Sequence, residues 1–265
     1  MGNTQKWALI LGASSGFGEA TSLELARGGM NIFGVHLDRK AALPHIEEII
    51  QKIKGMGREV IFFNVNAADD LKMDEVVSTI KAKFTEVPNS HLTVLLHSLA
   101  FGTLKPFIES DPANAITKAQ MDMTLDVMAH SLVYWTQKLV RQNLLTNGGR
   151  VYAMTSAGSS RVWKTYGAVS AAKAALESHI RQLALELAPL GITANAIMAG
   201  VTDTPALRKI PGNDYMIEAA RKKNPGGRCT TTEDIAKTLL TISNGSTAWM
   251  TGNTIRIDGG ENIVE

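Results

Sequence analysis

The chain has 265 residues, of which 45% are hydrophobic and 20% are charged, and its formal net charge is +2. This length allows one full α/β domain or two small domains. Basic and acidic residues are intermixed without a basic stripe, which argues against nucleic acid or anionic lipid as a partner. The single cysteine, Cys229, excludes an intramolecular disulfide and a multi-cysteine metal site, as expected in a reducing compartment.

The amino-terminal residues 1–16 enter an apolar run and a glycine-rich turn almost at once, which leaves no room for a signal peptide. No apolar run reaches the ~18 to 20 residues that a membrane helix needs. The six histidines have no ligand-like spacing, so we predict no metal site. We therefore expect a cytoplasmic protein that does not insert into a membrane.

Short apolar runs alternate with longer helical patterns along the chain. The predicted elements, in order, are strand 7–11, helix 16–27, strand 31–36, helix 41–54, strand 59–65, helix 69–84, strand 92–97, helix 117–143, strand 150–154, helix 166–188, strand 192–197, helix 232–243 and strand 254–257. The fourth strand, LTVLLH, is apolar without alternation, as expected of a parallel strand buried on both faces. Strands separated by helices form right-handed βαβ units. The pattern predicts an α/β Rossmann fold, with a seven-stranded doubly wound parallel sheet in one domain that covers residues 1–265.

A glycine-rich segment, Gly12-Ala13-Ser14-Ser15-Gly16-Phe17-Gly18, lies directly between the first strand and the first helix. Glycines let the backbone turn tightly and approach a pyrophosphate, and the free N–H groups and dipole of the helix start favour an anion. A lone motif of this kind is weak, but its place between a strand and a helix predicts a dinucleotide site.

A tyrosine and a lysine, Tyr166 and Lys173, follow a Ser/Thr/Gly cluster. Seven residues make almost two helical turns, so the two side chains are expected to face the same way, roughly 10 Å apart along the axis. An ammonium nearby favours the phenolate, so this tyrosine could donate a proton to a substrate oxygen and recover it. By itself the pair belongs more often to an ordinary surface helix than to a catalytic site.

Together with the segment Thr251–Gly260, these motifs resemble the short-chain dehydrogenase/reductase superfamily over essentially the whole chain. Most members have Tyr-x3-Lys, whereas Tyr166 and Lys173 have the Tyr-x6-Lys spacing of the enoyl-acyl carrier protein reductases. The segment His97-Ser98-Leu99-Ala100-Phe101 is similar to the His-Ser-Ile-Gly-Phe type of those enzymes. Met128 stands where the ketoreductase-type members place a proton-relaying asparagine.

The resemblance implies that Tyr166 donates a hydrogen bond to an enolate, and that Lys173 holds the nicotinamide ribose and the tyrosine. The best-known enoyl reductases carry a second tyrosine where this chain has Ser156. That residue, Asn64-Val65 and the segment 213–228 are more similar to a divergent, Bacillus-type branch that uses NADPH. Ser156 is therefore a third candidate catalytic residue, although a structural turn hydroxyl would look the same.

The cofactor preference depends on Asp38-Arg39-Lys40, after the second strand. An acidic residue here would hold a ribose diol and select NAD, whereas a basic residue would accept a 2′-phosphate. Asp38 favours NADH, whereas Arg39 and Lys40 favour NADPH. The resemblance to the Bacillus-type branch favours NADPH over NADH.

The resemblance and the motifs also assign the remaining site residues. Residues about 199–227 are expected to form a substrate lid, with Phe101 and Leu104 lining its mouth. The helices 117–143 and 166–188 usually pack between subunits in this superfamily, so the resemblance implies a homotetramer. The expected cofactor contacts are Gly12, Ser14, Ser15, Gly16, Phe17, Gly18, His36, Asp38, Arg39, Lys40, Asn64, Val65, Ser98, Leu99, Ala100, Thr155, Tyr166, Lys173, Gly200, Val201 and Thr204.

The favoured hypothesis is an NAD(P)H-dependent reductase of trans-2-enoyl thioesters, carried by acyl carrier protein or coenzyme A, in fatty acid biosynthesis. One alternative is a carbonyl reductase that acts on a 3-oxoacyl, steroid or sugar substrate. A second is a non-catalytic dinucleotide sensor, since a fold alone does not fix function.

Overall fold

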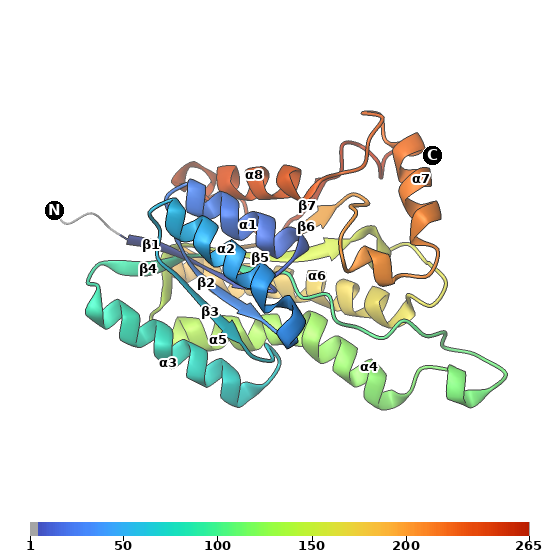
Figure 1. Ribbon diagram of the computed structural model, residues 1–265, viewed down its shortest axis with the longest axis horizontal. Coiled ribbons are helices and arrows are strands. Elements are labelled where there is room, and N and C mark those ends of the chain that lie inside the picture. The colour runs from blue at the N-terminus through green and yellow to red at the C-terminus, as the bar shows by residue number, and fades with distance from the viewer. Residues whose placement is uncertain (1–4, 265) are drawn as a thin grey trace.

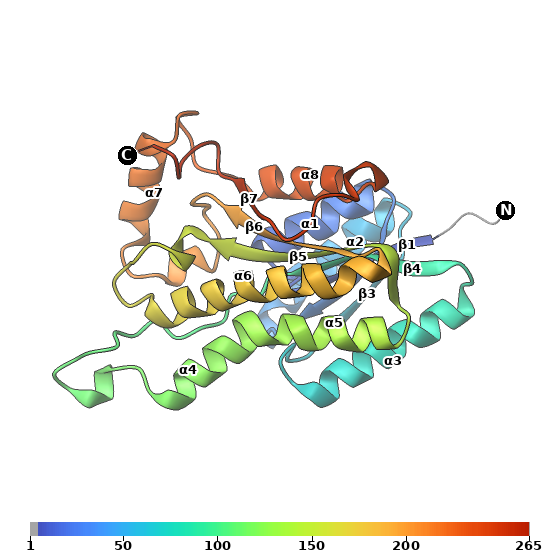
Figure 2. The same ribbon diagram turned by 180° about the vertical axis from the view of Figure 1, so that it is seen from behind.

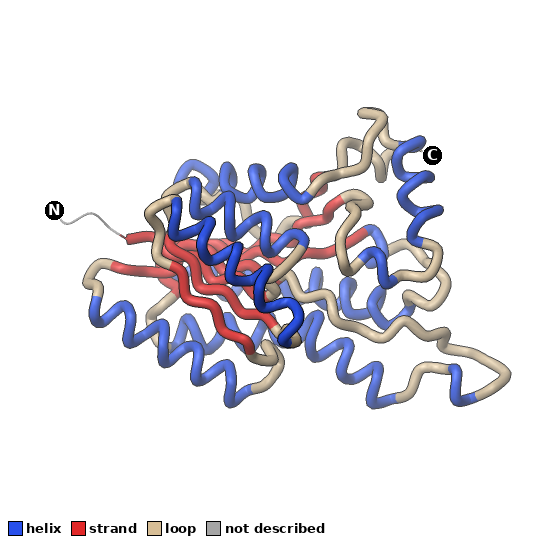
Figure 3. Tube along the Cα trace, in the orientation of Figure 1, coloured by secondary structure: helices blue, strands red, loops and turns tan. Residues whose placement is uncertain are grey.

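The computed structural model describes residues 5–264, and its centre is a parallel sheet of seven strands in the order β3-β2-β1-β4-β5-β6-β7. Figure 3 shows these strands as one layer between helices. This confirms the predicted Rossmann architecture. The strands are β1 (Gln5–Leu11), β2 (Asn31–His36), β3 (Val60–Asn64), β4 (Ser90–His97), β5 (Leu145–Ser156), β6 (Thr193–Ala199) and β7 (Thr254–Ile257).

Helices cover both faces of the sheet (Figures 1 and 2). One layer holds α1 (Gly16–Arg27), α2 (Leu43–Gly55) and α8 (Thr232–Ile242), which bury Leu25, Ile49 and Leu239 in a common core. The other layer holds α3 (Asp70–Glu86), α4 (Lys118–Leu125), α5 (Ser131–Arg141) and α6 (Gly167–Leu187). Its core includes Trp135 and Leu176, both fully buried. Because both faces are covered, the central strands can be apolar throughout, as the sequence pattern predicted.

Local sequence signals explain where several helices begin. Asp69 caps α3 by accepting a hydrogen bond from the backbone N–H of Lys72. Thr117 and Gln120 form a capping box at the start of α4, and Thr231 and Asp234 form another at the start of α8. These caps agree with the predicted starts of the helices to within about two residues.

The predicted helix 117–143 is observed as uninterrupted helical structure over residues 118–141, with one irregular turn inside it. A π-helical turn, η3 (Asp126–His130), separates α4 from α5. Ser131 Oγ donates to the carbonyl of Val127 at 2.8 Å across this turn. Such turns occur inside α-helices, and this one carries no glycine or proline that would mark it in the sequence.

The segment after β6, residues 201–228, contains a further helix that the glycines and prolines of the sequence obscured. This helix, α7 (Asn213–Lys223), stands at the end of the molecule near the C-terminus, outside both helical layers (Figure 1). In residues 5–264, no helix is long and apolar enough to cross a membrane. Because the segment 201–228 follows the end of β6, it begins at the carboxyl ends of the strands, where ligands bind in open α/β sheets.

Candidate active site

The glycine-rich turn connects β1 to α1 in a conformation that excludes side chains at two positions. Gly12 has φ +91°, and a Cβ there would lie 2.5 Å from the carbonyl oxygen of Ser98. A Cβ on Gly18 would lie 1.9 Å from the carbonyl oxygen of Gly12. The Ser15 side chain, at the N-cap of α1, makes no capping hydrogen bond within the described residues. The glycines of the turn thus present backbone without a side chain beside a helix start, which fits a dinucleotide pyrophosphate.

Two other predicted cofactor segments adjoin this turn. The N–H of Ser98 donates to the carbonyl of Leu11 at 2.8 Å, so residues 98–100 leave β4 beside the turn. On the other side, a Cβ on Gly16 would lie 3.5 Å from Thr204 Cγ2. The fold therefore gathers segments from three parts of the chain around one edge of the sheet.

Asp38 is fixed at the carboxyl end of β2 by two neighbours. His36 Nδ1 lies 3.1 Å from Asp38 Oδ2, and Asn64 bonds both the N–H and the carbonyl of Asp38 at 3.0 Å. Burial lowers the pKa of His36, and Asp38 opposes this effect. Arg39 and Lys40 are exposed beside them. The site thus holds both an ordered carboxylate and free cations where the adenosine ribose is expected.

Tyr166 lies one residue outside α6, at its N-cap, so the Tyr/Lys pair is only partly helical. Burial raises the pKa of Tyr166, and a hydrogen bond with Ser156 opposes the rise. The sequence had suggested that the Lys173 ammonium would lower this pKa, but Ser156 is the group that acts on the phenol. Ser156 Oγ also accepts from the N–H of Gly158 at 3.2 Å, so it is both a turn hydroxyl and a neighbour of Tyr166.

Lys173 is buried on α6 and points toward β5. Its Nζ donates to the carbonyl of Met154 at 2.7 Å. Burial lowers the pKa of Lys173 to about 8, and the nearby Glu177 carboxylate opposes this shift. Thr155 Oγ1 in turn donates to Glu177 at 2.6 Å. The ammonium is therefore drawn to a carbonyl and a carboxylate rather than to Tyr166.

Met128 lies on η3 and is buried against the loop that follows β4. A Cβ on Gly102 would lie 2.8 Å from its sulfur, and Met128 itself is 2% exposed. A thioether packed in this way cannot relay a proton. His97 is also fully buried, with Nε2 2.9 Å from Ser131 Oγ, and burial lowers its pKa to about 3. These features agree with a neutral histidine in the core.

A cavity of about 300 Å³ opens beside Tyr166. Phe101 and Leu104, the predicted mouth residues, are not among the residues that line this cavity. Phe101 is 60% exposed, and Leu104 packs against the core. Phe107 instead lies over the start of α6, where a Cβ on Gly167 would be 2.4 Å from its ring. The cavity is lined by Lys105, Pro106, Phe107, Ile108, Val162, Trp163, Thr165, Tyr166, Gly167 and Ser170. Its mostly apolar wall suits an apolar chain.

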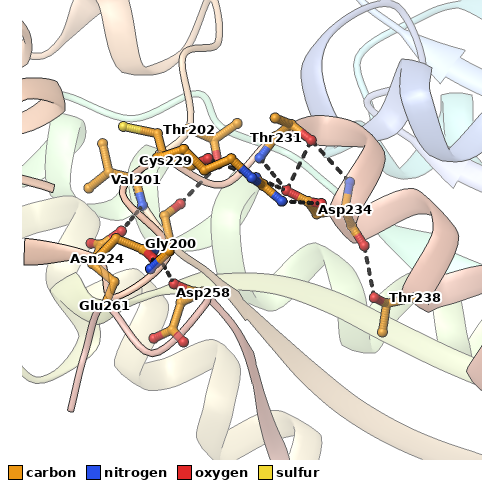
Figure 4. A network of polar contacts seen from close by, with 12 residues as sticks. Gly200, Val201, Thr202, Asn224, Cys229, Thr231, Asp234, Thr238, Asp258 and Glu261 are labelled. Atoms are coloured by element: carbon orange, nitrogen blue, oxygen red, sulfur yellow. Dashed lines mark hydrogen bonds and ion pairs between the residues drawn. The ribbon is translucent and has the colours of Figure 1, made fainter. Parts of the chain in front are cut away.

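A network of polar contacts fastens both ends of the 201–228 segment (Figure 4). Glu261 Oε2 accepts from the N–H of Val201 at 2.9 Å, beside Gly200. Asn224 Nδ2 donates to the carbonyl of Asp258 at 2.8 Å. The Arg228 guanidinium pairs with Asp234 and holds the pKa of that carboxyl well below its usual range. The middle of the segment has no part in this network.

This arrangement is typical of an NAD(P)-dependent oxidoreductase, because a glycine-rich turn at a helix start and a half-buried Tyr/Ser pair both lie at the carboxyl edge of a Rossmann sheet. The chain belongs to the short-chain dehydrogenase/reductase superfamily, and the family model that matches residues 12–262 is described as enoyl-(acyl carrier protein) reductase. It is a reductase of that superfamily.

Individual relatives are distant and differ in their reactions. The chain is 29% identical to a 1-cyclohexenylcarbonyl-CoA reductase of Streptomyces collinus, over 97% of this chain and 87% of that protein. It is also 29% identical to a 3-oxoacyl-[acyl-carrier-protein] reductase of Pseudomonas aeruginosa, over 96% of both chains. The crystal structure of the NADH-dependent enoyl-[acyl-carrier-protein] reductase of Aquifex aeolicus matches with a TM-score of 0.81 and 25% identity, over 98% of both chains. At these identities, enoyl and carbonyl reduction are both compatible with the family.

The structure adds three site neighbours that the sequence analysis did not single out. Glu177 lies four residues after Lys173, a spacing that places both on one helix face and could have been noticed. Trp163 is an aromatic residue three positions before Tyr166, in an otherwise polar cluster. Phe107 had no such signal, because only the path of the loop after β4 brings it to Gly167.

Proposed function

We propose that this protein reduces the C2–C3 double bond of trans-2-enoyl thioesters carried by acyl carrier protein, in fatty acid biosynthesis. The observation that carries the proposal is the seven-residue step from Tyr166 to Lys173, together with an apolar Met128 where carbonyl reductases place a relay. Residues 1–265 act as one domain, with 199–227 as the substrate lid.

The roles of the residues follow from their positions. A bound nicotinamide cofactor would supply the hydride for C3, and a solvent proton would complete the product at C2. Negative charge then develops on the thioester oxygen, and Tyr166, whose raised pKa keeps it protonated, donates a hydrogen bond to that oxygen. Ser156 orients the phenol, and Lys173 would hold the ribose hydroxyls. The apolar cavity beside Tyr166 accommodates the acyl chain.

NADPH is the favoured cofactor in this proposal. Arg39 and Lys40 are exposed beside the expected ribose position and can accept a 2′-phosphate. His36 lies against the Asp38 carboxylate, which moderates the repulsion that this carboxylate would exert on the phosphate. The family branch inferred from Ser156, Asn64 and Val65 supports the same choice. We further propose a cytoplasmic homotetramer, with α4–α5 and α6 between subunits.

The second candidate function is carbonyl reduction, which is favoured by the similarity to the 3-oxoacyl reductase of Pseudomonas aeruginosa. A direct comparison separates the two functions. Cofactor oxidation is followed with enoyl and 3-oxoacyl thioesters of the same chain length, on acyl carrier protein and on coenzyme A, with NADPH and with NADH. We expect oxidation of NADPH with the enoyl thioester. Oxidation with the 3-oxoacyl thioester alone would contradict the proposal.

A further inference from the structure

Trp163 contacts residues 211–215, which are distant from it in the sequence. Its Nε1 donates to the carbonyl of Pro211 at 3.1 Å, and its ring stacks on Tyr215 of α7, with centroids 6.3 Å apart and an interplanar angle of 23°. A Cβ on Gly212 would lie 3.3 Å from the same ring. Trp163 therefore holds the part of the 201–228 segment that the network of Figure 4 leaves free.

The backbone of Trp163 begins the turn that carries Tyr166. The carbonyl of Trp163 accepts from the N–H of Tyr166 at 3.1 Å. Between them, Thr165 has φ +66°, a left-handed conformation that a β-branched residue rarely adopts. Such a conformation persists only where the surroundings hold it in place. The contacts of Trp163 with residues 211–215 are such a constraint.

We propose that Trp163 couples the 201–228 segment to Tyr166 as a positioning residue. When residues 211–215 lie on the indole ring, the turn is held and the phenol faces the cavity that Trp163 also lines. When they leave it, the turn loses its anchor. The role of Tyr166 in catalysis rests on the proposed function, but the physical coupling does not.

Limited trypsin digestion tests the coupling without a substrate, because exposed cleavage sites lie on both sides of the contact. Lys164 lies in the turn, and Arg208 and Lys209 lie in the segment. Tyr215→Ala, which changes only α7, is expected to accelerate cleavage after Lys164 by about fivefold, from loss of one aromatic stack. Trp163→Ala is expected to accelerate cleavage after Arg208 and Lys209 roughly tenfold, since it also removes a hydrogen bond. Fragments are identified by mass spectrometry.

Matched controls separate coupling from general destabilisation. Trp249→Ala alters an exposed aromatic residue outside the site, and we expect cleavage rates within twofold of the parent. Trp163→Phe keeps a ring against Tyr215 and is expected to restore most of the protection. In a Trp163→Ala background, Tyr215→Ala should add no further acceleration. Unchanged cleavage after Lys164 in Tyr215→Ala would overturn the coupling.

A kinetic readout tests the effect on Tyr166. With whichever thioester the parent reduces, Trp163→Ala is expected to lower kcat about tenfold and to raise KM, whereas Trp163→Phe recovers kcat. Accelerated cleavage with kcat and KM within twofold of the parent would overturn the positioning role. If the parent reduces neither thioester, the proposed function fails, and the digestion still decides the coupling.

Discussion

The glycine turn at 12–18 and the 201–228 segment face each other across the site, but different constraints hold them. The turn is fixed by sterics, because Gly12 and Gly18 leave no space for a Cβ. The segment is fastened at its ends by hydrogen bonds and an ion pair, and between them by Trp163. The cofactor presents the same pyrophosphate to the glycine turn in every turnover, whereas the substrate must enter and leave the site. The rigid glycine turn suits cofactor binding, and the few separable contacts of the 201–228 segment suit substrate entry and release.

The largest expected effect concerns the tyrosine between the two regions. Tyr166→Phe removes the hydrogen-bond donor without changing the ring, so kcat should fall about 10³-fold, while cofactor affinity stays unchanged. Steady-state kinetics and a fluorescence titration of NADPH measure the two quantities. Trp249→Phe, at an exposed position outside the site, is the control. An unchanged rate of turnover would favour a protein in which Tyr166 has no catalytic role.

Gly18→Ala tests the steric constraint on the turn. The added Cβ would lie 1.9 Å from a backbone oxygen, so the turn must shift. We expect the Kd for the cofactor to rise roughly 100-fold, from misplacement of several phosphate hydrogen bonds. Gly55→Ala, at the end of α2 with nothing described within 4 Å, should leave binding unchanged. Binding by Gly18→Ala within threefold of the parent would show that the turn is not sterically fixed.

The pH dependence of cofactor use tests the charge on Lys173. Its lowered pKa, about 8, means that the ammonium is lost as pH rises through that value in the free enzyme. We expect kcat/KM for NADPH to fall about tenfold per pH unit above 8. Lys173→Arg, which stays charged, should show no such step, even at lower activity.

Unfolding measurements exclude a simple loss of structure as the cause of that step. The unfolded chain binds this proton more tightly between about 8 and the ordinary value of 10.5, so Lys173 makes the free energy of unfolding rise with pH across that window. Activity should fall while this contribution to stability rises. A flat kcat/KM profile would contradict the account of Lys173.

The smallest effect concerns the far end of the 201–228 segment. Asn224→Ala leaves the Asp258 carbonyl and the Gly226 N–H without their side-chain partner and should lower the free energy of unfolding by about 1–3 kcal/mol. Urea denaturation measures the change, and Asn114→Ala at an exposed loop position is the control. A loss of cofactor affinity as large as that of Gly18→Ala would erase the contrast between the two regions.

The sequence was most informative where one local rule determines the structure. Apolar runs predicted the strands, because the central ones are buried on both faces, and Gly12 and Gly18 marked a turn with no space for a side chain at these two positions. It was least informative where distant segments meet. The π-helical turn at 126–130 contains no glycine or proline that would mark it, and glycines and prolines concealed α7. The contacts of Phe107 with Gly167 and of Trp163 with Pro211 depend on how two loops pass each other, which no local pattern encodes.

The destination of the hydride distinguishes enoyl reduction from carbonyl reduction. A trans-2-enoyl thioester is incubated with NADPH deuterated at C4 of the nicotinamide, and the product is examined by mass spectrometry and NMR. The account predicts a saturated acyl thioester with deuterium at C3 and a solvent proton at C2. Recovery of the unlabelled enoyl thioester, alongside deuterated 3-hydroxyacyl product from a parallel 3-oxoacyl reaction, would contradict it.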